Sequence, residues 1–184
     1  KLRTVSDVLG RAVRVEQLNA ANNSVIATLQ TTAYDATGQK GLVDKTCTGT
    51  CTANDVIIDN TGYDARNRPT SSRYQVPSAW GFGNVVGSQS QFDFGYGYNA
   101  ADLTTSITYP SLNGQTAEQV TTSYNNAGQP QLLGSGGTPG TYSYDTAYDS
   151  YGRISTRRYG QGIDTANQIT RTWVYDGYGR LTPV

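Results

Sequence analysis

The chain of 184 residues contains no histidine, no methionine and only two glutamates, Glu16 and Glu118. Without histidine, Ser-His-Asp and Cys-His catalytic arrangements are excluded, and the most common metal ligand is missing. The two glutamates lie far apart in the sequence, and most aspartates at recurring positions are explained as turn residues. We therefore expect no enzymatic activity, no metal site and no cofactor in these residues.

Charge and long apolar runs are scarce too. Charged residues make up 15% of the chain, and 14 acidic residues balance 14 basic ones, so the formal net charge is zero. A chain without net charge has no overall field to attract nucleic acid or an anionic membrane. No apolar stretch approaches the 18 residues of a transmembrane helix. We expect no nucleic-acid partner and no membrane span.

What the sequence does contain is a repeated six-residue phrase. Tyr148–Arg153 and Tyr175–Arg180 are nearly identical, and looser copies begin at Ser6, Tyr34, Tyr63, Tyr98 and Tyr124. Self-similarity at a period of about 20 to 50 residues is typical of repeat proteins, in which each unit packs on its neighbours. We expect a single array of about seven repeats over residues 1–184, with an insertion between Tyr63 and Tyr98, as part of a longer polypeptide.

The phrase has the chemistry of a tight hairpin turn. Asp or Asn at its second position can accept hydrogen bonds from later backbone N–H groups, and Gly at the fifth adopts a positive φ without steric cost. We expect the aromatic residue to end one strand and Arg or Gln to begin the next. Asn67 and Asp102 replace the Gly in two copies, so we expect those turns to be altered. The residues assigned to this structural motif are Asp7, Gly10, Arg11, Tyr34, Asp35, Gly38, Tyr63, Asp64, Tyr98, Tyr124, Asn125, Gly128, Tyr148, Asp149, Gly152, Arg153, Tyr175, Asp176, Gly179 and Arg180.

The segments between the phrases alternate as strands do. Phe92, Phe94, Tyr96 and Tyr98 alternate with Asp93, Gly95 and Gly97. Period-two alternation rich in aromatic and β-branched residues indicates half-buried strands. No stretch of a dozen residues has a convincing helical period. We predict an all-β fold in which tandem hairpins form a continuous antiparallel sheet ribbon.

Two features lie outside the repeat. Cys47 and Cys51 are four residues apart around Gly49, and we predict a disulfide, which implies an oxidising compartment. Reduced thiols or half of a metal site are the alternatives. Trp80 and Phe82 lie within the insertion, where they either bind a ligand such as a sugar by stacking or cap the local core.

The phrase Tyr-Asp-x-x-Gly-Arg-Leu/Ile, with Tyr-rich strands between its copies, resembles the YD repeat of the rearrangement-hotspot (Rhs) family. It is also similar to the β-shell repeats of insecticidal toxin-complex proteins and teneurins. The best matches are Tyr148–Ile154, Tyr175–Leu181 and Asp7–Val13, and the resemblance covers nearly the whole chain. It implies a sheet ribbon that spirals into a hollow shell, which in the toxin members holds a C-terminal toxin domain.

The resemblance implies a structural segment of a secreted or cell-surface bacterial protein, forming the wall of a shell that encapsulates a toxin domain. The alternative is a self-associating extracellular fibre or an adhesive module that binds glycans. The partners expected are neighbouring repeats or further copies of the chain, together with an enclosed toxin domain or surface glycans.

Overall fold

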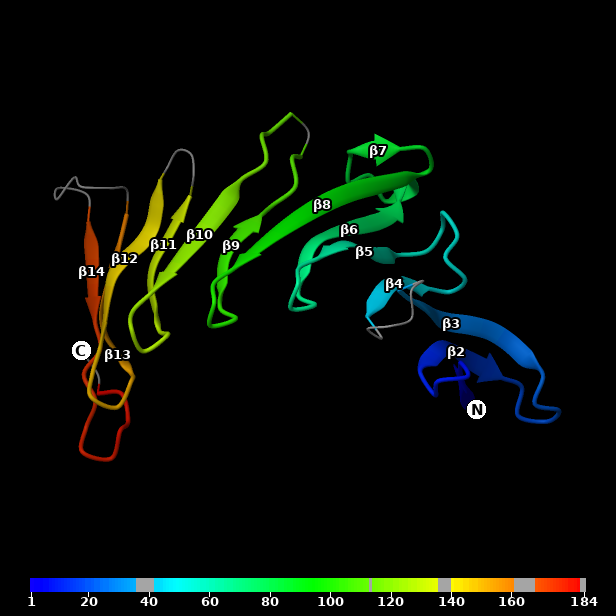
Figure 1. Ribbon diagram of the computed structural model, residues 1–184, viewed down its shortest axis with the longest axis horizontal. Helices are drawn as coiled ribbons and strands as arrows, with labels where there is room; N and C mark the ends of the chain where they lie inside the picture. Colours follow the sequence, from blue (N-terminus) through cyan, green and yellow to red (C-terminus); the bar gives the residue numbers. More distant parts are fainter. Residues whose placement is uncertain (36–41, 113, 136–139, 161–167, 183–184) are drawn as a thin grey trace. The chain divides into compact units, whose positions relative to one another are not determined.

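The computed structural model describes residues 1–35, 42–112, 114–135, 140–160 and 168–182. Figure 1 shows these residues as a series of strands. The elements are β1 (Leu2–Ser6), β2 (Ala12–Leu18), β3 (Val25–Tyr34), β4 (Val43–Thr48), β5 (Ile57–Tyr63), β6 (Pro69–Pro77), the 3-10 turn η1 (Ser78–Trp80), β7 (Val85–Val86), β8 (Gln89–Tyr98), β9 (Thr104–Thr108), β10 (Gln119–Tyr124), β11 (Pro130–Ser135), β12 (Thr141–Tyr148), β13 (Ile154–Tyr159) and β14 (Ile169–Thr172).

The strands form one open sheet of fourteen strands, which confirms the predicted all-β class. They are hydrogen-bonded in sequence order, except that β7 pairs only with the beginning of β8. Two compact units can be distinguished, one made of Lys1–Gly95 with Pro110–Thr116 and the other of Tyr96–Tyr109 with Ala117–Val184. Within each unit, neighbouring strands run antiparallel, as expected of tandem hairpins.

The sheet has almost no apolar core. Among the described residues, the buried apolar side chains are Leu18, Cys47 and Ile57, whereas five polar or charged side chains, including Glu16 and Ser90, are equally buried. Because burial of apolar side chains is normally the largest favourable contribution to folding, the strands of this protein must depend more on hydrogen bonds and on side-chain pairs along the sheet.

The repeated phrase forms the same hairpin in most of its copies. Tyr148 at the end of β12 pairs with Ile154 at the start of β13, six residues later, and the register shifts just before this pair. The same six-residue offset joins Ser6 to Ala12, Tyr63 to Pro69 and Tyr124 to Pro130. The aromatic residue therefore ends its strand as predicted, but the next strand begins one residue after the Arg or Gln.

The structure describes the fifth position of the phrase in six copies, and in all six the residue there has a left-handed backbone. The φ angle is 78° at Gly152, 64° at Asn67 and 63° at Asp102. At the two non-glycine positions, the N–H groups donate to the carbonyls of Asp64 and Asn99, as the N–H of a motif glycine does. The expectation of altered turns at these two copies is therefore wrong, because Asn and Asp tolerate the left-handed region better than other non-glycine residues.

The second copy differs in length. Tyr34 pairs with Val43, nine residues later, and the N–H of Asp35 donates to the carbonyl of Leu42 at 2.9 Å. The return strand thus begins three residues later than in the other hairpins. Gly38, predicted to be the turn glycine, lies outside the described residues.

The predicted insertion separates β6 from β8. After β6, the chain passes through η1 and β7, and the two residues of β7 pair with Gln89 and Ser90. The same two β8 residues also pair with Pro77 and Val76 of β6. β8 is therefore bonded on both sides at its beginning, which explains why Ser90 is fully buried.

Gly10 offers a clean test of the backbone requirement of the turn. Its φ is 79°, and a Cβ atom added at this position would have no other atom within 4 Å. We expect Gly10→Ala to lower the free energy of unfolding by about 1–2 kcal/mol through backbone strain alone. Gly10→Asn should cost less, because Asn67 occupies the same position in another copy. Urea unfolding would measure both, and an unchanged stability of Gly10→Ala would refute the requirement.

Candidate functional site

The side chain at the second position of the phrase organises the turn. The Oδ1 atom of Asp149 accepts hydrogen bonds from the N–H groups of Tyr151 and Arg153, both at 2.9 Å, and its Oδ2 accepts from the Arg153 Nε at 2.7 Å. Asp7, Asp64 and Asp176 make the same three bonds in their own turns. Each carboxylate thus fixes the backbone and the orientation of an arginine at once.

These bonds favour the ionised carboxylates. The backbone N–H of Arg68, followed by its guanidinium group, lowers the pKa of Asp64 below its usual value, and Arg180 does the same to the pKa of Asp176. At Asp149, partial desolvation raises the pKa, but the side-chain and backbone bonds from Arg153 outweigh it and the pKa is lowered. The turn aspartates therefore serve as permanent anions at neutral pH.

One copy reproduces this arrangement without charge. Asn125 replaces the aspartate, and its Oδ1 accepts from the N–H groups of Ala127 and Gln129 at 3.0 Å. Its Nδ2 donates to Oε1 of Gln129 at 2.9 Å, where the copies with Asp7, Asp64, Asp149 and Asp176 have an ion pair. The Gln129 amide also donates to the carbonyl of Gly152 in the next turn, at 3.4 Å. The motif is therefore a hydrogen-bond pattern that an ion pair strengthens.

The motif tyrosines connect one repeat to the one before it. The hydroxyl of Tyr124 donates to the carbonyl of Thr104 at 2.6 Å, and that of Tyr175 donates to the carbonyl of Ile154 at 3.1 Å. In each case the acceptor is the first residue of the outgoing strand of the preceding hairpin. The same contact joins Tyr34 to Ala12, Tyr63 to Val43 and Tyr148 to Pro130.

The arginines reinforce this connection. The Arg153 guanidinium carbon lies 4.1 Å from the ring centroid of Tyr175 in the next repeat and 5.0 Å from that of Tyr151 in its own turn. Arg11 lies 4.4 Å from the Tyr34 ring centroid in the same way. Such contacts contribute about 0.5–1 kcal/mol when exposed. At these two places, aspartate, arginine and the next tyrosine therefore form a continuous series of contacts from one turn to the next.

The predicted ligand-binding pair, Trp80 and Phe82, is exposed. Their side chains are 57% and 54% accessible, and their rings make an edge-to-face contact with centroids 6.3 Å apart. Val85 and Val86 of β7 are exposed next to them in sequence. The insertion thus presents apolar side chains to solvent.

The predicted disulfide between Cys47 and Cys51 is present, with the Cα atoms 5.3 Å apart. Cys47 belongs to β4 and is buried, while the loop that follows is held by Asp55, whose Oδ2 accepts from the N–H and hydroxyl groups of Thr52. The backbone bond from Thr52 is the main reason why the pKa of Asp55 is lowered. The disulfide therefore closes a small, well-bonded loop in unit Lys1–Gly95.

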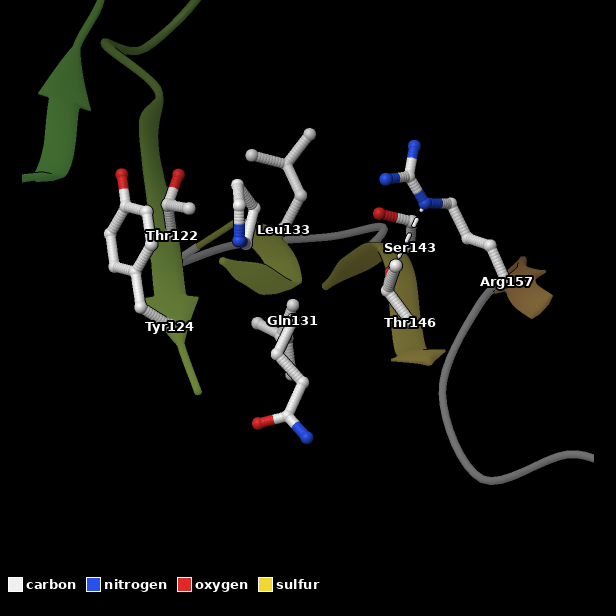
Figure 2. A pocket seen from close by; sticks show the side chains of 9 residues that line it. Thr122, Tyr124, Gln131, Leu133, Ser143, Thr146 and Arg157 are labelled. Carbon is white, nitrogen blue, oxygen red and sulfur yellow. Dashed lines mark hydrogen bonds between the residues drawn. The ribbon is translucent and has the colours of Figure 1, made fainter. Parts of the chain in front are cut away.

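Sequence reasoning missed a pocket of about 310 Å³ in the second unit, formed by strands β10 to β13. Figure 2 shows hydroxyl and amide side chains around it, with Arg157 at one end. Its lining consists of Thr122, Tyr124, Pro130, Gln131, Leu132, Leu133, Ser143, Thr146 and Arg157. The only sequence signal of this pocket is the pair of arginines in β13, Arg157 and Arg158, which lie outside the repeated phrase.

The part of the chain that the structure describes contains neither a cluster of metal ligands nor a membrane-spanning helix. No group of three or more His, Cys, Asp or Glu side chains is placed to hold a metal ion there. No helix in this part is long and apolar enough to cross a bilayer. What the described residues do offer is a regular set of contacts between repeats, together with the pocket and the exposed insertion.

The contribution of the tyrosine hydroxyl can be measured by a matched pair of variants. We expect Tyr124→Phe to lower the free energy of unfolding by about 1 kcal/mol, because it removes the bond to Thr104 and leaves the ring in place. Tyr151→Phe should have no effect, because Tyr151 is 82% exposed. Equal stability of the two variants in urea unfolding would show that the hydroxyl bond does not couple the repeats.

The turn aspartates also predict an acid dependence. The fold lowers the pKa of Asp64, so near pH 4 the unfolded chain binds more protons at this residue than the folded chain does. The ionised Asp64 carboxylate therefore stabilises the fold above that pH, and this stabilisation is lost as the pH falls further. Asp64→Asn keeps the backbone bonds, as Asn125 does, but cannot titrate. We expect this variant to be less stable at pH 7 and to lose less stability between pH 5 and about pH 3. Parallel pH dependences in urea unfolding would contradict this.

No protein-family model matches the chain, and no curated protein is significantly similar to it. Some solved structures, however, have a fold similar to that of this chain. The chain superimposes on a TcdB2-TccC3 structure with a TM-score of 0.69 at 10% identity, over 98% of its own length and 9% of that chain. A TcdB2-TccC3-TEV structure gives a TM-score of 0.60 at 10% identity, over 98% and 11% of the two chains. The chain therefore has the fold of a segment about one tenth as long as these proteins.

Proposed function

We propose that this chain is a wall segment of a β-shell that encloses a toxin domain within a secreted or cell-surface protein. The observation that carries the proposal is the contact between each motif tyrosine and the carbonyl that begins the outgoing strand of the preceding hairpin. It recurs in five copies, so each of these five repeats is bonded to its predecessor. In this proposal the seven repeats act as one array.

The composition of the sheet supports a wall better than a globular core. A shell has one face towards its contents and one towards the solvent, so both faces of its sheet need polar groups. Among the described residues, the buried side chains are mostly polar, and large apolar side chains such as Leu29 and Ile169 remain exposed. The likeness to the TcdB2-TccC3 structures, over nearly the whole chain, supports the same architecture.

A structural role without catalysis fits the use of the acidic residues. Asp7, Asp64, Asp149 and Asp176 are committed to ion pairs with the arginines of their own turns. Glu16 is buried between Arg3 and Arg14, with N–O distances of 2.5 and 3.2 Å. We propose that the chain is no enzyme, because the sequence has no histidine and these carboxylates already have structural partners.

The disulfide supports an extracellular location. Disulfides persist in oxidising environments and are rare in the cytosol of most organisms. The Cys47–Cys51 bridge joins residues only four positions apart, so its effect on stability is local. It is a marker of the compartment in which this chain folds.

The second candidate function is an adhesive surface module. The observation that favours it is the exposed pair Trp80 and Phe82, whose rings are in contact, with exposed Val85 and Val86 following within a few residues in the sequence. Exposed aromatic rings can stack on the apolar face of a sugar, and a contiguous exposed apolar patch often marks an interaction site. Self-association through the same patch is the fibre version of this candidate.

Protection of an enclosed polypeptide tests the wall function. The natural polypeptide that carries this chain would be treated with trypsin, alongside a variant carrying Tyr124→Ala and Tyr148→Ala. Both tyrosines bond to the preceding hairpin, so we expect the sequence beyond the repeats to be protected in the wild type and cleaved in the variant. Tyr151→Ala, at an exposed ring, is the matched control and should protect fully. Equal cleavage in all three proteins would refute enclosure.

The adhesive candidate makes a different prediction. If the exposed pair binds glycans, Trp80→Ala should abolish binding on a glycan array without changing stability, because the ring is exposed. If it mediates self-association, the same variant should lower the concentration-dependent light scattering of the purified chain. Absence of both effects would leave the wall function as the only candidate.

A further inference from the structure

Two arginines face each other across strands β13 and β14. Arg157 and Arg171 are direct partners in the antiparallel register of these strands. Directly opposed residues place their side chains on the same face, with Cβ atoms about 5 Å apart, and like charges in such positions are destabilising. An arginine pair at this place therefore calls for a compensating negative charge.

No carboxylate of the described residues supplies that charge. The neighbouring arginines are neutralised, since Arg158 pairs with Asp145 at 2.9 Å and Arg153 pairs with Asp149 at 2.7 Å. Arg157 instead donates from Nε to the Thr146 hydroxyl at 3.1 Å, and its two terminal NH₂ groups take no part in this bond. The guanidinium carbon of Arg171 lies 5.1 Å from the centroid of the Trp173 ring, again without an acidic partner in this part of the chain.

A β-bulge in β12 keeps the nearest acid off this face. Tyr144 pairs with Arg158, but the next pair along the strands is Ala147 with Thr156, so that two residues of β12 lie opposite Arg157 alone. One of them, Asp145, has a φ of 46° and forms its ion pair with Arg158, on the other face of the sheet. The other residue places a hydroxyl, not a carboxylate, beside Arg157.

The hydroxyl groups next to Arg157 are buried. Thr146 is 5% exposed and Ser143 is 8% exposed, and both line the pocket with Arg157 at one end (Figure 2). Thr122 adds a further hydroxyl group to the lining, whereas the hydroxyl of Tyr124 already donates to the carbonyl of Thr104. The pocket thus combines one guanidinium with several neutral hydrogen-bond donors, and a second guanidinium lies on the adjacent strand.

We propose that this site binds a phosphate group, held between Arg157 and Arg171 with the hydroxyls of Thr146 and Ser143 as further donors. Guanidinium groups match the geometry of phosphate oxygens with paired N–H donors. A phosphate dianion neutralises both arginines, whereas a single carboxylate leaves one positive charge uncompensated. The group is either inorganic phosphate or the phosphate of a monoester. This inference is independent of the wall function, since it concerns one bulged hairpin and not the contacts between motif turns.

The test is calorimetric titration of the purified chain with inorganic phosphate, at an ionic strength held constant with sodium chloride so that general screening does not change. We expect saturable binding at one site and a thermal midpoint that rises with phosphate concentration. Glycerol phosphate, titrated in the same way, distinguishes the two sources. Binding of both shows that the pocket accepts a monoester, and binding of inorganic phosphate alone restricts the site to the free ion. Sodium acetate should bind more weakly than either.

Three variants decide whether the arginine pair is responsible. Arg157→Gln and Arg171→Gln should each weaken phosphate binding about tenfold or more, as expected for the loss of a charge-assisted hydrogen bond. Arg158→Gln is the matched control, because Arg158 lies on the same strand but pairs with Asp145 on the other face. Its affinity for phosphate should equal that of the wild type.

The variants also control for folding. Without phosphate, Arg171→Gln should unfold at the same temperature as the wild type or higher, because a repulsive pair is removed. The side chain of Arg171 is exposed, so this variant keeps the test valid even if Arg157→Gln does not fold. Absence of saturable binding to the wild type would overturn the proposal, and so would an equal loss of affinity in Arg158→Gln and Arg171→Gln.

Discussion

The hydrogen bond from a motif tyrosine to the carbonyl that begins the outgoing strand of the preceding hairpin is the constraint on which the rest of the structure depends. A sheet with three buried apolar side chains among its described residues cannot rely on a core to set the position of one hairpin against the next. The hydroxyl of Tyr63 reaches the carbonyl of Val43, and burial raises the pKa of this tyrosine, which keeps its hydroxyl protonated as a donor. The hydroxyl is therefore available as a donor at neutral pH.

The turn and the tyrosine contact support each other. The carboxylate of Asp149 orients Arg153, and Arg153 then lies against the ring of Tyr175, whose hydroxyl bonds to Ile154. Each of these contacts is worth little by itself at an exposed position. Where they occur together, as at Asp149, Arg153 and Tyr175, they share atoms and therefore restrict the same few side chains several times over. A polar network thereby sets the position of one hairpin against the next, as an apolar core does for the elements of a globular domain. The network also accommodates an uncharged copy, in which Asn125 bonds to Gln129.

The sequence predicted best those features that depend on a few consecutive residues, such as the turns. A glycine, an aspartate and a tyrosine at fixed spacing imply one backbone conformation, because few residues adopt a positive φ, and that conformation also appears at Asn67 and Asp102, where glycine is absent. The bulge at Asp145 could not be predicted in this way, since it depends on the register between two strands. The pocket beside Arg157 could not be predicted for the same reason. The register between two paired strands decides on which face of the sheet a side chain lies, and one extra residue in a strand moves every later side chain to the other face.

The contacts between repeats also have a direction. Five motif tyrosines bond back to the preceding hairpin, while Arg11 and Arg153 contact the tyrosine ring of the next repeat. Arg153 has rings at two positions, Tyr151 and Tyr175, and its side chain is 30% exposed, whereas Arg180 contacts Tyr178 and is 75% exposed. At the first phrase, Ser6 offers no phenol group for a contact in the backward direction. Backbone pairing between antiparallel strands would allow hairpins to be added on either side, so it is the side chains of the phrase that distinguish one side of a repeat from the other.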